Sequence, residues 1–296
     1  MKKRNLVLSV MTTCLVSCFL LSGCNGQKQI DSETVKTVKV EEQAHLQDDT
    51  VSPACKITID YSYLAESDAA DSIAQRINRT IQAHVLGKEY IRMNPEVAVD
   101  SFKNTYIDNY RKDVNEFYQE DIKNGTPKDE LPTWYNYEYG LTTHFSEGKE
   151  GILNFIAETF EYTGGAHPNS WNKWMNFEKN TGKLLALKDV FMAGSEKPMS
   201  DMLLEELITE MATRLEDSSI TSLEGLQNAG ILNSTNMYVP DNFLLEKEKV
   251  SFLYNKYDIA PYAVGVITLS LPYTLVEKYM ICLLYTSPSP RDLSTS

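Results

Sequence analysis

The first clear pattern along the chain is a strict alternation of apolar and polar residues over residues 56–63. Four large side chains would share one face of this segment: Ile57, Ile59, Tyr61 and Tyr63. A period of two predicts an amphipathic β-strand. Ser67 or Asp68 then precedes apolar residues that recur every four positions over residues 73–85. This second pattern predicts a capped helix that packs on the strand and ends at Gly87.

Apolar residues at spacings of three and four predict a second, longer helix that begins near Pro95. Its apolar stripe would consist of Val99, Phe102, Tyr106, Tyr110, Val114 and Phe117. Asn124 and Gly125 would end it, because glycine tolerates the left-handed backbone of a helix C-terminus. Alternation returns over residues 135–145, and an apolar run over residues 152–162 follows a short turn. These two segments predict an antiparallel strand pair.

The last part of the chain predicts strands around residues 171–177, 250–254 and 264–271, with one helix among them. That helix would bury Met199, Leu203, Leu207, Met211 and Leu215. Because turns rather than crossover helices join most strands, we expect the α+β class, with antiparallel sheets and helices packed on one face. Two lobes are expected, an N-terminal lobe over residues 54–130 and a C-terminal domain over residues 131–281. In the alternative arrangement, the tyrosine-rich strand completes the first sheet.

The N-terminal end has the sequence pattern of an export signal rather than of a folded domain. A basic start precedes the apolar residues 6–20, and residues 21–24, Leu-Ser-Gly-Cys, resemble a bacterial lipobox. We therefore expect a signal peptide over residues 1–23 and a lipid on Cys24. The protein would then lie in the cell envelope, with the lipid as its contact with a membrane outside the cytoplasm. An uncleaved N-terminal helix is the alternative.

Two further segments lack the pattern of a packed core. Residues 24–53 are polar and acidic, which predicts a disordered tether behind the lipid. Residues 282–296 read like translated sequencing-adapter sequence, so we expect no regular structure there and no disulfide partner for Cys282. Cys55 is then the only cysteine of the folded part, and we interpret it as a small buried residue.

Charge narrows the choice of partners. The 296 residues include 28 Lys and Arg against 41 Asp and Glu, a net charge of −13. Without the predicted signal peptide and the last fifteen residues, 24 basic and 40 acidic residues remain, a net charge of −16. Nucleic acid is not an expected partner, because its phosphates require clustered Lys and Arg. A mean hydropathy of −0.33 argues against a polytopic membrane protein.

Candidate chemistry is sparse. The four histidines have no second His or Cys at metal-ligand spacing, so neither a metal nor a cofactor is expected. The loop at residues 163–168 is the best local candidate, because Gly164 and Gly165 permit close backbone approach beside His167. The alternative is a structural hairpin loop in which His167 hydrogen-bonds the neighbouring strand. Three further candidate ligand-binding residues are Trp171, Asp258 and Tyr262.

Three motifs resemble a family of extracytoplasmic domains. They are EYTGGAH at residues 161–167, NTGK with LKDVF at residues 180–191, and YDIAPYAVG with LPY at residues 257–273. This domain of unknown function occurs in RsiV-type anti-sigma factors that sense lysozyme and beside the catalytic domain of PdaC-type peptidoglycan deacetylases. Residues 57–125 are similar to the smaller domain that precedes it. The resemblance implies an α+β fold and no particular activity.

The chain also departs from both kinds of relative. It has a lipobox in place of the cytosolic sigma-binding segment of the RsiV-type proteins, and it lacks the Asp-Asp and two-His signature of the deacetylases. Neither sigma-factor sequestration nor deacetylation is therefore expected.

Two hypotheses of function remain open. The first is a non-enzymatic binding module for a protein or glycan ligand, such as a cationic, lysozyme-like muramidase or peptidoglycan, whose encounter an acidic surface would steer. The second is a hydrolase of peptidoglycan or other glycans, or an accessory subunit of one. That activity would require paired carboxylates in a cleft, for which Glu161, Asp189 and Asp258 are the candidates.

Overall fold

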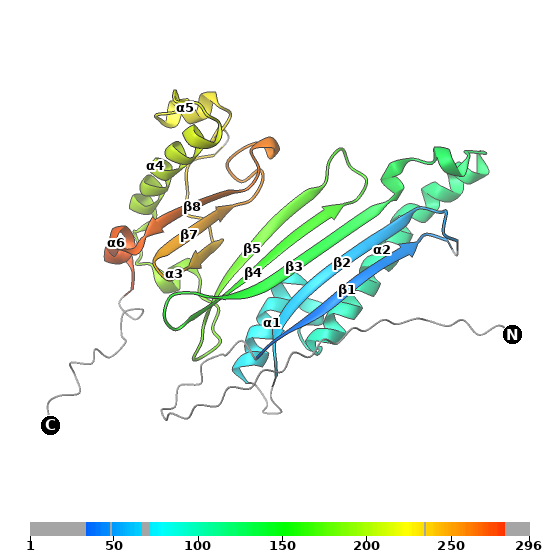
Figure 1. Ribbon diagram of the computed structural model, residues 1–296, viewed down its shortest axis with the longest axis horizontal. Coiled ribbons are helices and arrows are strands. Elements are labelled where there is room, and N and C mark those ends of the chain that lie inside the picture. The colour runs from blue at the N-terminus through cyan, green and yellow to red at the C-terminus, as the bar shows by residue number, and fades with distance from the viewer. Residues whose placement is uncertain (1–33, 48, 67–71, 234, 282–296) are drawn as a thin grey trace.

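The computed structural model describes residues 34–47, 49–66, 72–233 and 235–281. Two sheets make up the core of the molecule (Figure 1). The first holds β1 (Val35–His45), β2 (Ala54–Leu64), β3 (Tyr137–Glu147), β4 (Ile152–Tyr162) and β5 (Asn169–Glu178), in that order. The second holds β6 (Phe243–Leu245), β7 (Lys249–Tyr254) and β8 (Ile267–Pro272). The α+β prediction is confirmed.

Helices cover one face of the first sheet. These are α1 (Ile73–Val85) and α2 (Pro95–Lys123), which together connect β2 to β3. A helical connection of this length allows β2 and β3 to pair in parallel, whereas the other strand pairs of the described residues are antiparallel. The alternating β2 residues predicted from the sequence form the core beneath the helices, with Ile57 and Tyr61 fully buried against Ile77 and Tyr110.

The predicted division near residue 130 is wrong for the first sheet. β3 pairs with β2 in a register that sets Ile57 opposite Tyr139, so the sheet runs across that position. The tyrosine-rich strand completes the first sheet, as the alternative held. A division near 130 would have left β2 with an unpaired edge, which the β2–β3 ladder removes.

The predicted tether over residues 24–53 is also wrong where the structure describes it. Val35–His45 forms strand β1, which pairs with β2 along its whole length and sets Val40 opposite Ile59. A few apolar residues are enough to form this edge strand, because it buries only one face. On that face, Val38, Val40 and Ala44 contact the core. Residues 1–33, with the predicted signal peptide and Cys24, lie outside the described residues.

Helix α1 spans the predicted apolar repeat, but its cap is a residue that the sequence analysis did not name. Ser72 is its N-cap, and the Ser72 side chain accepts a hydrogen bond from the backbone N–H of Gln75 at 3.3 Å. The predicted cap residues Ser67 and Asp68 lie outside the described residues. Cys55 is free and fully buried, as predicted, and burial raises the pKa of its thiol to about 12.

The second sheet packs against four helices: α3 (Leu187–Val190), α4 (Glu196–Arg214), α5 (Leu223–Asn228) and α6 (Tyr273–Val276). The predicted stripe of α4 is buried from Met199 to Met211. Leu215 lies one residue beyond the helix and is 42% exposed, so its inclusion in the stripe was wrong. No helix among the described residues is both long and apolar enough to cross a membrane. Residues 282–296, with Cys282, lie outside the described part.

Asparagine side chains join the two sheets. On β5, the Asn176 amide donates to the carbonyl of Phe243 and accepts from the N–H of Leu245, both at 2.8 Å. From the other side, the side chains of Asn242 and Asn255 each accept from a β5 backbone N–H at 2.7 Å and donate to the carbonyl of Asn172. Side-chain amides therefore take the place of a backbone ladder between β5 and the second sheet.

Candidate functional site

The loop at residues 163–168 between β4 and β5 meets the connection between β7 and β8. The Tyr262 ring stacks on His167, with centroids 4.0 Å apart, and its hydroxyl donates to the carbonyl of Pro168 at 2.8 Å. The Tyr257 hydroxyl and the His167 Nε2 atom are hydrogen-bonded at 3.3 Å. The Lys256 ammonium lies 4.3 Å from the Tyr262 ring centroid. We name His167, Lys256, Tyr257 and Tyr262 the loop cluster.

A tight turn presents the loop cluster to solvent. The Asp258 carboxylate accepts from the N–H of Asn255 at 2.7 Å, and the Asp258 N–H donates back to the carbonyl of Asn255 at 3.1 Å. Between them, Tyr257 adopts a left-handed backbone with φ of 70° and leaves 60% of its surface exposed. Such a conformation costs a bulky residue about 1–2 kcal/mol, and the surrounding turn holds it in place.

The structure brings together only part of the predicted site. His167 and Tyr262 are in contact, although 95 positions separate them in the sequence. Asp258 shapes the turn rather than a groove. Trp171 is 36% exposed on β5, opposite Thr159. The hydrogen-bond partners of His167 are Tyr257 and the neighbouring Pro168 carbonyl, so the loop joins the two sheets rather than only closing a hairpin.

Sequence reasoning missed Lys256 and Tyr257 as members of the site. A Lys-Tyr pair immediately before Asp258 was the available signal. Whether this pair belongs to a site depends on which other loop lies beside it. The local sequence pattern does not contain that information.

Gly164 and Gly165 have different roles in the loop. Gly164 has φ of +84°, and a Cβ atom there would lie 2.4 Å from the Trp134 carbonyl oxygen. At Gly165 φ is not positive, and the nearest atom to an added Cβ is 3.9 Å away. Gly164 therefore permits close packing of the loop on Trp134, whereas Gly165 faces open space.

Gly164→Ala is expected to lower the free energy of unfolding by about 1–3 kcal/mol, because the new methyl group meets backbone and the residue must keep a left-handed φ. Gly165→Ala is the matched control and should change the free energy of unfolding by less than about 0.5 kcal/mol. Urea unfolding of both variants measures the difference. Equal effects of the two substitutions would show that the loop does not rest on Trp134.

The three carboxylates proposed for catalysis have separate local partners. Glu161 accepts from the Tyr106 hydroxyl at 2.8 Å, and Asp258 holds the turn after β7. Asp189 pairs with Lys183 at 2.6 Å, which lowers the pKa of Asp189, and it also accepts from the N–H of Ala186. Within the described residues, no group of three or more His, Cys, Asp or Glu side chains is placed to hold a metal ion.

Two family profiles match the sequence. Residues 50–170 match the family described as "Deacetylase PdaC", and residues 188–274 match the one described as "Protein of unknown function (DUF3298)". The first match ends at the start of β5, and the second begins in α3. No curated protein matches the sequence.

Solved structures that are similar to the chain include two DUF3298 family proteins. A member of the DUF3298 family from Bacteroides fragilis is 29% identical, with a TM-score of 0.75 over 85% of this chain and 95% of that one. A DUF3298 family protein from Pseudomonas aeruginosa is 16% identical, with a TM-score of 0.58 over 86% and 97% of the two chains, and agrees in fold alone. The chain is thus similar to the PdaC family over residues 50–170 and to the DUF3298 family over residues 188–274.

Proposed function

We propose that this chain is a lipoprotein of the cell envelope whose folded part is a non-enzymatic binding module for a protein or glycan ligand. The loop cluster is the observation that carries this proposal. Tyrosine side chains, with one polar end and one apolar face, are enriched where proteins bind partners. In the loop cluster, contacts between the two loops orient these side chains, and the Tyr257 ring remains exposed.

A cationic, lysozyme-like muramidase is the ligand that we favour. The net charge of −16 that remains without the predicted signal peptide and the last fifteen residues would attract a basic protein over distances of about 10 Å at ordinary salt. The similarity of the motifs to those of RsiV-type lysozyme sensors supports the same ligand. Binding is favoured over hydrolysis because Glu161, Asp189 and Asp258 are each engaged with different neighbours.

Titration of the full chain with hen lysozyme tests the proposal. Tyr257→Asn is expected to weaken binding about tenfold or more, because it removes the exposed ring but tolerates a left-handed φ. Leu275→Ala, which removes an apolar side chain that is 46% exposed on α6, is the control and should leave binding unchanged. Absence of any binding at low salt would exclude the muramidase. Loss of metabolic palmitate labelling in Cys24→Ala tests the anchor independently.

A further inference from the structure

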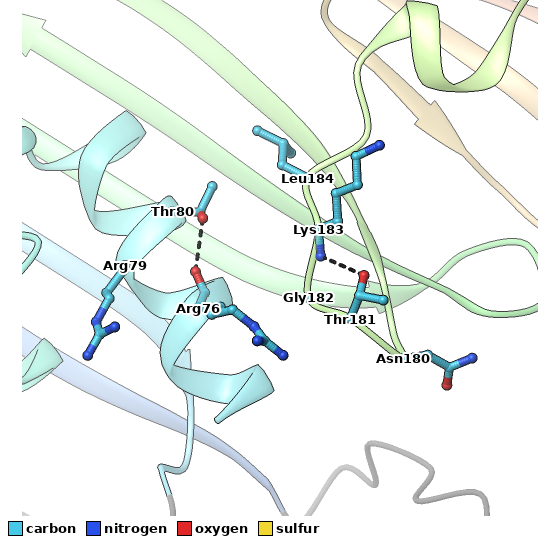
Figure 2. A pocket seen from close by; sticks show the side chains of 8 residues that line it. All are labelled: Arg76, Arg79, Thr80, Asn180, Thr181, Gly182, Lys183 and Leu184. Atoms are coloured by element: carbon cyan, nitrogen blue, oxygen red, sulfur yellow. Dashed lines mark hydrogen bonds between the residues drawn. The ribbon is translucent and has the colours of Figure 1, made fainter. Parts of the chain in front are cut away.

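Strand β1 forms an open edge of the first sheet. Within the described residues no strand pairs with its outer side, and Figure 1 shows β1 as the outermost strand. The opposite edge strand, β5, is occupied, because the amides of Asn242 and Asn255 bind its backbone. The turn that follows β5 also lies beside α1 (Figure 2), where a Cβ atom on Gly182 would be 3.1 Å from the Ile73 carbonyl oxygen. Among the described residues, β1 is therefore the edge of this sheet that can take a further strand.

The outer side of β1 presents a regular row of backbone groups. At the two ends of the β1–β2 ladder, the Thr34 carbonyl accepts from the N–H of Ala65 at 2.6 Å, and the Leu46 N–H donates to the carbonyl of Pro53 at 2.8 Å. Antiparallel bonding alternates along a strand, and the register has no bulge. The even-numbered residues of β1 therefore bond to β2, and the odd-numbered residues direct their N–H and C=O groups outward. Because β1 contains no proline, this row runs along all eleven residues of the strand.

Charge is divided along β1. Lys36 and Lys39 lie in its first half, and Glu41 and Glu42 lie in its second half. Even-numbered side chains face α2, where Lys103 binds Glu42 at 2.9 Å, so Lys39 and Glu41 lie on the other face, and both are exposed. When two identical strands pair in antiparallel fashion, the basic half of each lies against the acidic half of the other. β1 is therefore complementary in charge to a second copy of itself.

We propose that β1 pairs with β1 of a second copy of the chain, antiparallel about a two-fold axis at Val40. In this register all eleven residues pair, and Lys39 lies opposite Glu41 of the second copy. Both residues belong to the outward-facing row, so they also exchange backbone hydrogen bonds. A shift by one residue would oppose this row to residues already bonded to β2, and a shift by two would set Lys39 opposite Lys39 or Glu41 opposite Glu41. Lys39 would then lie between Glu41 of the second copy and Asp60 of β2, which it binds at 2.7 Å.

This pairing goes beyond the proposed function and is tested through the oligomeric state. Sedimentation velocity of the full chain, with Cys24→Ser to exclude association through a lipid, should show a reversible dimer that increases with concentration. Glu41→Lys should raise the dimer dissociation constant about tenfold or more, because Lys39 then faces a like charge. The double variant Lys39→Glu/Glu41→Lys restores opposite charges and should dimerise more tightly than Glu41→Lys. Glu158→Lys makes the same charge change at an exposed position of β4 and should leave the dissociation constant unchanged.

Disulfide cross-linking of the same chain tests the register. Val40→Cys would place two thiols across the axis in a pair with Cα atoms about 4.5 Å apart, which suits a disulfide. Val38→Cys is the matched control: Val38 is also half-buried on the same face, but its counterpart would lie about 13 Å away along the strand. Oxidation should give a covalent dimer of the first variant only, above the background of the parent chain.

Three results would overturn the proposal. The first is a chain that stays monomeric at about 100 μM, which would leave the edge to a strand of a different protein. The second is an equal dissociation constant for Glu41→Lys and Glu158→Lys. The third is equal cross-linking through Val40→Cys and Val38→Cys.

Discussion

Replacement of Asn176 by alanine is expected to lower the free energy of unfolding by about 2–5 kcal/mol. The Asn176 side chain is 1% exposed and bonds both the carbonyl of Phe243 and the N–H of Leu245. Alanine leaves both backbone groups buried without these partners, and an unsatisfied buried polar group costs about 1–3 kcal/mol. The two residues belong to β6, so the loss falls on the joint between the sheets.

Asn169→Ala is the matched control for this prediction. Asn169 begins the same strand, is exposed, and its side chain bonds only the adjacent N–H of Ser170 at 2.9 Å among the interactions of the described residues. Its replacement should change the free energy of unfolding by less than about 0.5 kcal/mol. Urea unfolding followed by circular dichroism compares the two variants. Similar values would mean that the Asn176 amide is not needed to hold the second sheet on β5.

The elements that the sequence predicts well have a complete pattern of their own. β2 alternates without a break from Lys56 to Tyr63, and α1 repeats isoleucine every four residues. Each pattern follows from one buried face, so a single segment contains all the information. β1 lacks this completeness, because apolar residues at 35, 38, 40 and 44 alternate imperfectly among charged and polar ones. An edge strand is stable only when it pairs with its neighbour, so it can be predicted only once that neighbour is known.

The candidate site shows the same limit at longer range. The residue types at His167 and Tyr262 drew attention to both loops, but their stacking depends on how the two sheets are joined. Asn242 and Asn255 make that joint, and asparagine in a loop is usually a sign of a turn. The contact between sheets is therefore encoded in side chains whose local pattern has another, more common meaning.

Deletion of residues 34–46 is expected to destabilise the chain by about 5 kcal/mol or more. β1 pairs with β2 over eleven positions, and its apolar residues cover part of the core. Without it the β2 edge is open and the burial of several aliphatic side chains, each worth about 1.5–3 kcal/mol when complete, is lost. Because whole domains have only about 5–15 kcal/mol of stability, the first sheet should no longer unfold cooperatively.

The control for this deletion is Lys39→Ala, which keeps the strand and removes only an ion pair with Asp60 at 2.7 Å. The Lys39 side chain is 76% exposed, so the change in stability should stay below about 0.5 kcal/mol. Thermal unfolding by circular dichroism measures both variants in the full chain. An unchanged melting temperature after the deletion would show that residues 34–46 act as part of the tether that the polar composition of residues 24–53 suggests. A large loss of stability would assign residues 34–46 to the folded core. The tether would then end before Val35.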